Sequence, residues 1–157
     1  MGKHSLRLLS MVLGSGVRDV VFFQGCGKRC KGCHNPQTWD YMGGNHYFFG
    51  DVVDELDKSS NDVTFSGGEP LDQLDDLLRL AEHCKSKGKN VWVYTGNTVD
   101  PTKSIYIELS KVVDVIVDGR FVEELKDSNL LFRGSSNQRI IDLPKSVKAE
   151  QIILWEE

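Results

Sequence analysis

Three cysteines lie close together in one short stretch of the chain, residues 23–39, where they could bind a metal. Cys26 and Cys30 are separated by three residues, and Cys30 and Cys33 by two. Thiolate sulfur is a soft ligand that suits zinc, copper(I) and iron–sulfur clusters. The one other cysteine, Cys84, is distant in sequence. The stretch therefore offers three sulfur ligands and leaves one coordination position open.

The number of cysteines bears on the kind of metal site. A structural zinc site takes four ligands, and iron–sulfur clusters are usually held by four thiolates. Cys84 falls on the apolar face of a predicted helix, residues 71–87, which favours a small buried side chain over a fourth ligand. A cluster held by three cysteines keeps one iron free for a substrate. The pattern therefore favours a catalytic cluster over a structural metal.

A second motif, Ser66-Gly67-Gly68-Glu69-Pro70, follows a short apolar segment. The two glycines let the backbone approach a ligand closely or adopt positive φ. The Glu69 carboxylate could pair with an ammonium group, and Pro70 suits the first turn of a helix. By itself the motif is that of an ordinary strand-to-helix turn. Its place, at the end of the first predicted strand after the cysteines, favours a binding role.

The elements that would position both motifs alternate between strands and helices. Short apolar runs predict buried strands, and helical spacing of apolar residues predicts helices between them. The strands are expected at 20–23, 63–65, 91–94 and 112–117, and the helices at 48–56, 71–87 and 105–109. Such alternation indicates an α/β fold with parallel strands, whose carboxyl ends share one edge where ligands bind. The cysteines and the other polar strand ends are expected at that edge.

Length and composition narrow the fold and the class of protein. The chain has 157 residues, which fits one domain over residues 1–157 but not an eight-stranded barrel of roughly 250 residues. We expect a partial (β/α) barrel with a mostly parallel, curved sheet. A net charge of −4 does not favour nucleic-acid binding, and no apolar run reaches the roughly 20 residues of a membrane span. Clustered cysteines in a protein expected in the cytoplasm favour metal binding over disulfides.

Taken together, the two motifs resemble those of the radical S-adenosylmethionine (SAM) superfamily. In that superfamily the open iron of a [4Fe-4S] cluster binds the amino and carboxylate groups of SAM. The resemblance implies that Cys26, Cys30 and Cys33 hold the cluster. It also implies SAM contacts from two segments, the first around the last cysteine and the second in the glycine motif: Gly32, Cys33 and His34, then Ser66, Gly67, Gly68 and Glu69.

A narrower resemblance concerns the residues after the last cysteine. Cys33-His34-Asn35-Pro36 is similar to the branch that installs glycyl radicals on partner enzymes. The segments VWVYTG (91–96), VDVIVDGRF (113–121) and FRGSSNQR (132–139) resemble the activators of anaerobic ribonucleoside-triphosphate reductase. The likeness covers about residues 14–143 and leaves a C-terminal tail, 144–157.

Two residues of that region have no settled role from sequence. The family usually has a Gly-Pro-Gly turn before an arginine near its start, but here Ser15 replaces the proline, so Arg18 has no assigned role. Asp118 matches an aspartate that lies near SAM in a related activase. It is equally interpreted as a solvated turn residue before Gly119.

The resemblance implies a radical SAM oxidoreductase with a protein substrate. An external donor such as flavodoxin reduces the cluster, SAM is cleaved to methionine and a 5′-deoxyadenosyl radical, and this radical takes a hydrogen atom from a glycine of the reductase. Alternatives are activation of pyruvate formate-lyase or another small radical SAM reaction. The non-enzymatic alternative is an iron–sulfur electron carrier, which the lack of a fourth clustered cysteine disfavours. The oligomeric state stays open, a homodimer included.

Overall fold

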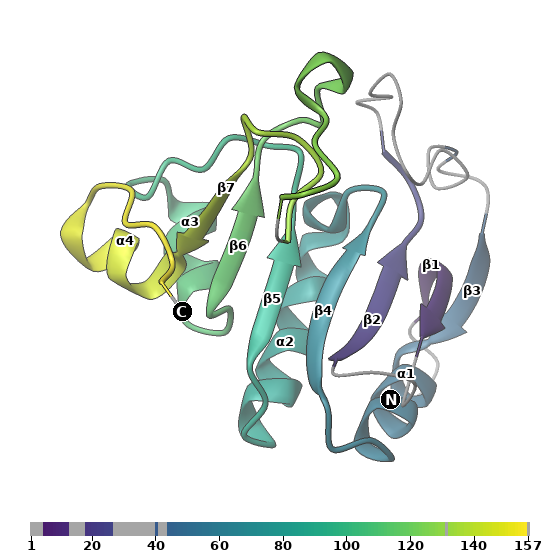
Figure 1. The fold of residues 1–157 in the computed structure, drawn as a ribbon. Coiled ribbons are helices and arrows are strands. Elements are labelled where there is room, and N and C mark those ends of the chain that lie inside the picture. The colour runs from purple at the N-terminus through teal and green to yellow at the C-terminus, as the bar shows by residue number, and fades with distance from the viewer. Residues whose placement is uncertain (1–4, 13–17, 27–39, 41–43, 131, 157) are drawn as a thin grey trace.

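In the described part of the chain, seven strands form one mixed sheet. The computed structural model describes residues 5–12, 18–26, 40, 44–130 and 132–156. The strand order is β3-β1-β2-β4-β5-β6-β7 (Figure 1). The strands are β1 (Ser5–Val12), β2 (Arg18–Phe23), β3 (Asn45–Phe48), β4 (Asp62–Gly67), β5 (Val91–Tyr94), β6 (Val115–Asp118) and β7 (Arg139–Asp142).

The middle of the sheet is parallel, as the sequence predicts. Strands β2, β4, β5 and β6 pair in parallel in that order. The predicted strands at 20–23, 63–65 and 91–94 are confirmed, but the fourth begins at Val115 instead of Val112. Val112 and Val113 instead donate backbone hydrogen bonds to Leu109 and so finish the turn after the preceding helix.

The flanks of the sheet are antiparallel, which the sequence analysis does not predict. Strand β1 pairs antiparallel with both β2 and β3. At the other side, β7 pairs antiparallel with β6. Among the described residues the sheet is thus open, with β3 as the strand at one edge and β7 as the strand at the other. An α/β fold with a mostly parallel centre is confirmed, and these data show no barrel.

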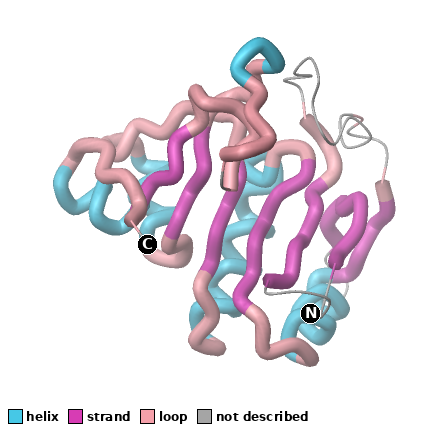
Figure 2. The backbone as a smooth tube through the Cα atoms, viewed as in Figure 1, coloured by secondary structure: helices cyan, strands magenta, loops and turns pink. Residues whose placement is uncertain are grey.

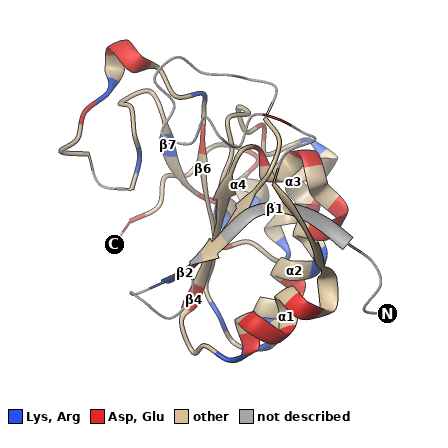
Figure 3. Ribbon diagram, turned by 90° about the vertical axis from the view of Figure 1, so that its right-hand side faces the viewer, with Lys and Arg blue, Asp and Glu red and all other residues tan. Residues whose placement is uncertain are grey.

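Three of the α-helices lie on one face of the sheet. The α-helices are α1 (Phe49–Asp57), α2 (Leu74–Ser86), α3 (Ser104–Ser110) and α4 (Leu143–Ala149), and two short 3-10 turns are η2 (Pro70–Gln73) and η3 (Glu123–Leu125). Figures 1 and 3 show α1, α2 and α3 against the same face. Helix α2 buries Leu77, Leu80, Ala81 and Cys84, a spacing typical of one helical face. Its apolar stripe therefore forms part of the main core between helices and sheet.

The opposite face of the sheet carries a smaller cluster. Trp92, Val115 and Val117 are buried there, and Trp155 packs against them. Trp155 also donates its backbone N–H to Ile140, and Leu154 forms a bridge with Ile141. The C-terminal tail, whose position the sequence left open, therefore folds onto the body of the protein. Among the described residues, no helix is both long and apolar enough to cross a membrane.

Candidate functional site

The carboxyl ends of the parallel strands meet at one edge of the sheet. Phe23 pairs with Gly67 across β2 and β4, and Tyr94 pairs with Val117 across β5 and β6. The loops that follow β2 and β6 lie at the same end of the sheet (Figure 2). The beginning of the cysteine segment and the glycine motif are therefore neighbours in space, about 40 residues apart in the chain.

Gly67 and Gly68 lie directly against the backbone that leads to Cys26. A Cβ atom added at Gly67 would collide with the backbone of Phe23, and one added at Gly68 would collide with the carbonyl oxygen of Gly25. Gly67 also has a positive φ of 119°, which side chains on L-residues disfavour. The Gly68 N–H donates to Phe23 at 3.1 Å and the Glu69 N–H donates to Gly25 at 2.8 Å. Both glycines are thus required by this close approach.

The carboxylate of Glu69 is buried between strand ends. Its side chain is fully buried. It accepts hydrogen bonds from the Gly96 N–H at 2.8 Å, the Thr95 hydroxyl at 2.8 Å and the Leu71 N–H at 3.1 Å. The last of these caps η2, where Pro70 occupies the first turn as predicted. Pairing of this carboxylate with a ligand ammonium stays a prediction.

The structure places some of the predicted site residues and leaves others outside its description. Cys26 is half-buried and lies three residues after the end of β2. Ser66 to Glu69 lie beside that segment. Gly32, Cys30, Cys33 and His34 lie outside the described residues. The described residues by themselves contain no group of three metal-binding side chains, so the ligand set stays a prediction.

Asp118 is a buried ion-pair partner, so its interpretation as a solvated turn residue is wrong. Its side chain is 2% exposed, and its oxygens accept from Arg139 Nε at 3.0 Å and Nη2 at 2.6 Å. The Val99 N–H donates to the same carboxylate at 2.8 Å. The hydrogen bonds to Asp118 raise the pKa of the Arg139 guanidinium. This pair ties β6, β7 and the loop after β5 together at the same edge of the sheet.

The segment 132–139 closes over the end of β6. Gln138 donates its side-chain amide to Gly119 at 3.0 Å and accepts from the backbone of Gly134 and Ser135. Asn137 donates to the carbonyl oxygen of Arg120 at 2.9 Å. These contacts hold the segment against the residues that follow β6.

Arg18 lies at the opposite end of the strands and fastens them together. Its guanidinium donates to Thr64, Asn90 and the carbonyl oxygen of Val63 at 2.7–3.0 Å, and it lies 5.4 Å from the Trp92 ring. Burial lowers the pKa of this arginine. The structure therefore gives Arg18 a role in holding β2, β4 and β5, away from the candidate site.

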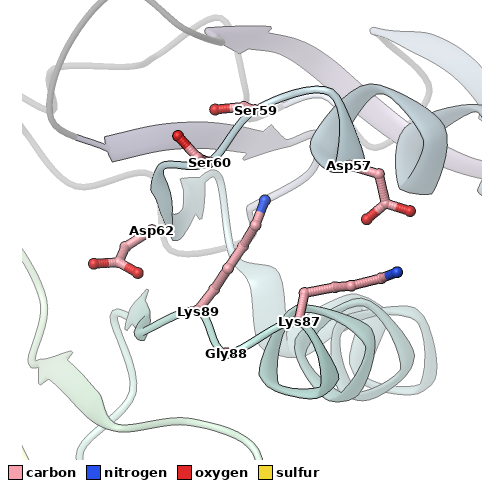
Figure 4. A pocket seen from close by; sticks show the side chains of 7 residues that line it. All are labelled: Asp57, Ser59, Ser60, Asp62, Lys87, Gly88 and Lys89. Carbon is pink, nitrogen blue, oxygen red and sulfur yellow. The ribbon is translucent and has the colours of Figure 1, made fainter.

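One cavity lies at this opposite edge as well. It has a volume of about 290 Å³ and is formed by the loops before β4 and β5 (Figure 4). Lys89 points into it and donates to the carbonyl oxygen of Leu56 at 2.7 Å. Its walls mix two lysines with two aspartates, Asp57 and Asp62, so charge does not favour one kind of ligand.

Cys84 is a core residue, as its helical spacing predicts. It is 1% exposed, and burial raises the pKa of its thiol to about 11. A thiol with such a pKa is a poor metal ligand and nucleophile near neutral pH.

Sequence reasoning listed Thr95 and Gly96 only as a polar strand end. Their contacts with the Glu69 carboxylate make them part of the candidate site. Arg139 was noted only as the end of a family segment. The signal that could identify them is position, because Thr95 directly follows β5 and Arg139 begins β7.

Comparisons with known proteins agree with this geometry. Residues 12–141 match the family model of the 4Fe-4S single cluster domain, which supports an iron–sulfur cluster in this chain. The anaerobic ribonucleoside-triphosphate reductase-activating protein of Escherichia coli (strain K12) is 34% identical over 149 residues, covering 88% of this chain and 96% of that protein. Its namesake from Vibrio cholerae is 33% identical, covering 89% and 97%.

A second group of relatives is longer. The pyruvate formate-lyase-activating enzyme of Clostridium pasteurianum is 34% identical over 164 residues, covering 99% of this chain but 67% of that enzyme. The length of the match therefore distinguishes the two groups. The chain belongs to the 4Fe-4S single cluster domain family and, within it, to the family of anaerobic ribonucleoside-triphosphate reductase-activating proteins.

Proposed function

We propose that this chain is a radical SAM activating enzyme that generates a glycyl radical on anaerobic ribonucleoside-triphosphate reductase. The observation that carries the proposal is the match to activating proteins of that reductase over 96–97% of their length. Pyruvate formate-lyase activation is the second candidate, because relatives of that name are equally identical. The match covers 67% and 65% of the length of those two relatives.

The residues present fit a cluster and SAM at the carboxyl edge of the sheet. Cys26, Cys30 and Cys33 would hold three irons of a [4Fe-4S] cluster, because their thiolates are the usual ligands of such clusters. The glycine pair lies directly against the segment that carries Cys26, so its backbone would lie beside the cluster and contact the amino group of SAM. Backbone groups of Gly32 to His34 would contact the adenine.

When bound, the cluster and SAM supply reductive cleavage of a carbon–sulfur bond and the radical that removes a hydrogen atom from a glycine of the partner. The protein supplies positioning and electrostatics. Its four parallel strands and one-sided helices support a partial (β/α) barrel of the radical SAM type, in one domain over residues 1–157 with a core at about 14–143. A sheet that stays open, with separate edge strands β3 and β7, suits a substrate that is itself a protein loop. A flavodoxin-type donor, a homodimer and a cytoplasmic location complete the proposal.

The test is reconstitution without oxygen followed by electron paramagnetic resonance (EPR). The wild-type protein should bind about four irons, turn SAM into 5′-deoxyadenosine when reduced, and produce a glycyl radical signal on the reductase. Pyruvate formate-lyase in place of the reductase should show no such signal. A radical on the lyase alone would favour the second candidate.

Cysteine variants provide the matched comparison. Cys30→Ser should lose the cluster and the radical signal, because serine is a poor cluster ligand. Cys84→Ser should keep both, because Cys84 lies on the buried face of α2, in the core. Colourless wild-type protein with one tightly bound zinc would refute the proposal.

A further inference from the structure

A buried carboxylate joins the glycine motif to a neighbouring strand. Charged carboxylates are seldom fully buried unless they are paired or hydrogen-bonded. Glu69 is fully buried, and three donors of the chain satisfy it, namely the Gly96 N–H, the Leu71 N–H and the Thr95 hydroxyl. Two of these donors belong to the residues directly after β5, so the side chain anchors the motif to β5.

The main chain of the same residue is attached to the cysteine segment. Its N–H donates to the carbonyl oxygen of Gly25 at 2.8 Å, and the N–H of Gly68 donates to Phe23 at 3.1 Å. Gly25 directly precedes Cys26. Glu69 therefore links the first cluster cysteine, through its backbone, to the end of β5, through its carboxylate.

Thr95 sets the orientation of that carboxylate. It is 4% exposed, and its hydroxyl donates to Glu69 at 2.8 Å while accepting the Asn97 N–H at 3.0 Å. Its own N–H donates to Val117 of β6 at 2.9 Å. Because its hydroxyl and backbone are both bonded, Thr95 is held rigidly and can hold Glu69 in turn.

We infer that Thr95 and Glu69 are a positioning pair that fixes the Gly67–Gly68 backbone relative to Cys26, so that one SAM molecule reaches both the cluster and the glycine motif. The inference rests on the proposed function, because it assigns these groups to SAM binding. A ligand held at two points needs those points at a fixed separation, and small misplacements are costly. Neither Thr95 nor the Glu69 carboxylate has to touch SAM for this effect.

Thr64 offers a matched control. It is 8% exposed, and its hydroxyl accepts a 2.9 Å hydrogen bond from Arg18. It lies within β4, towards the end of the strands that carries Arg18. A threonine-to-valine change keeps the side-chain volume nearly constant at either position. It removes one hydrogen bond at Thr64, from Arg18, and two at Thr95, to Glu69 and from the Asn97 N–H. Both variants should therefore lower stability. An effect confined to Thr95 would then report positioning.

The experiment measures SAM binding by the EPR signal of the reduced cluster during titration with SAM. Thr95→Val should keep wild-type iron content but weaken SAM binding about tenfold, since a buried hydrogen bond to a charged group is lost. Thr95→Ser, which retains the hydroxyl, should bind SAM within about threefold of wild type. Thr64→Val should lose stability but bind SAM as the wild type does.

A second variant keeps the inference testable if Thr95→Val does not fold. In Glu69→Gln either orientation of the amide points its NH₂ at a fixed backbone N–H, of Gly96 or of Leu71. Two facing donors are unfavourable, so this variant should also weaken SAM binding with the cluster retained.

The outcomes separate the inference from the proposed function. Wild-type SAM binding in Thr95→Val and Glu69→Gln overturns the inference and leaves the proposed function intact. Equal weakening in Thr64→Val overturns it too, because general loss of stability would explain the effect. A wild-type cluster whose signal does not respond to SAM overturns both.

Discussion

At the scale of single residues, the backbone packed against Gly67 and Gly68 explains why both positions are glycine. Gly67 and Gly68 are in contact with the backbone of Phe23 and Gly25, where no side chain fits. The sequence predicted that these glycines permit close approach. The structure identifies the approaching group as the chain segment that leads to the first cluster cysteine.

Replacement of Gly67 by alanine should destabilise the protein strongly. Its Cβ would overlap the Phe23 backbone at a positive φ, so we expect a loss of about 3 kcal/mol or more in the free energy of unfolding. Gly88→Ala is the matched control, because Gly88 also has a positive φ, of 76°, but no atom within 4 Å of the added Cβ. That variant should lose only about 1 kcal/mol. Urea unfolding measures both, and equal losses would contradict the close contact.

At the scale of elements, α2 illustrates how the spacing of apolar residues in a helix distinguishes a buried core cysteine from a metal-binding cysteine. The spacing of Leu77, Ala81 and Cys84 places them on one face. That face is buried against the sheet together with Leu80, and the polar residues of the helix lie elsewhere. Burial in turn explains the raised pKa of the Cys84 thiol.

This raised pKa predicts a pH dependence of stability. The unfolded chain releases the thiol proton near pH 9, whereas the folded chain retains it up to about pH 11. The contribution of Cys84 to stability is therefore complete below pH 9 and declines as the pH rises to about 11, by up to about 3 kcal/mol. Urea unfolding of Cys84→Ala over the same range should show a shallower decline than the wild type. Parallel curves would mean that the thiol is not buried in the folded protein.

At the scale of the whole molecule, the two faces of the sheet are covered by different parts of the chain. Helices cover one face (Figure 1), and Trp155 near the C-terminus contributes to the cover of the other. Trp155 lies 5.0 Å from Trp92 and 6.0 Å from Phe132, measured between ring centroids. The tail is thus part of the folded unit, because Trp155 contacts aromatic rings that are distant from it in sequence.

Removal of one of these rings tests the contribution of the tail. Trp155→Ala should lower the free energy of unfolding by about 2 kcal/mol, below the full cost for a completely buried tryptophan because Trp155 is only half-buried. Leu154→Ala is the control and should lose less than about 1 kcal/mol, because Leu154 is 57% exposed. Similar stability of the two variants would show that the tail does not pack as described.

Some of the fold follows from local patterns. The short apolar runs predicted three central strands closely, because a buried parallel strand requires apolar side chains on both faces. The fourth began three residues later than predicted, because apolar residues at 112 and 113 serve equally well to close the turn after α3. The antiparallel pairing of β1 and β7 with the central strands was not predicted, since strand pairing depends on the neighbouring strand more than on local sequence.

By itself, the sequence determined the type of chemistry and the edge of the sheet at which it is expected. Cysteine spacing and the glycine motif are local features, because the ligands lie within one short segment and the motif within one turn. Only the tertiary structure decided the partners of Glu69, Asp118 and Arg18. Each of these charged side chains is at least partly buried, and a buried charge must find donors or acceptors wherever the fold provides them. Those partners lie between 2 and 72 residues away, and no local pattern encodes the distant ones.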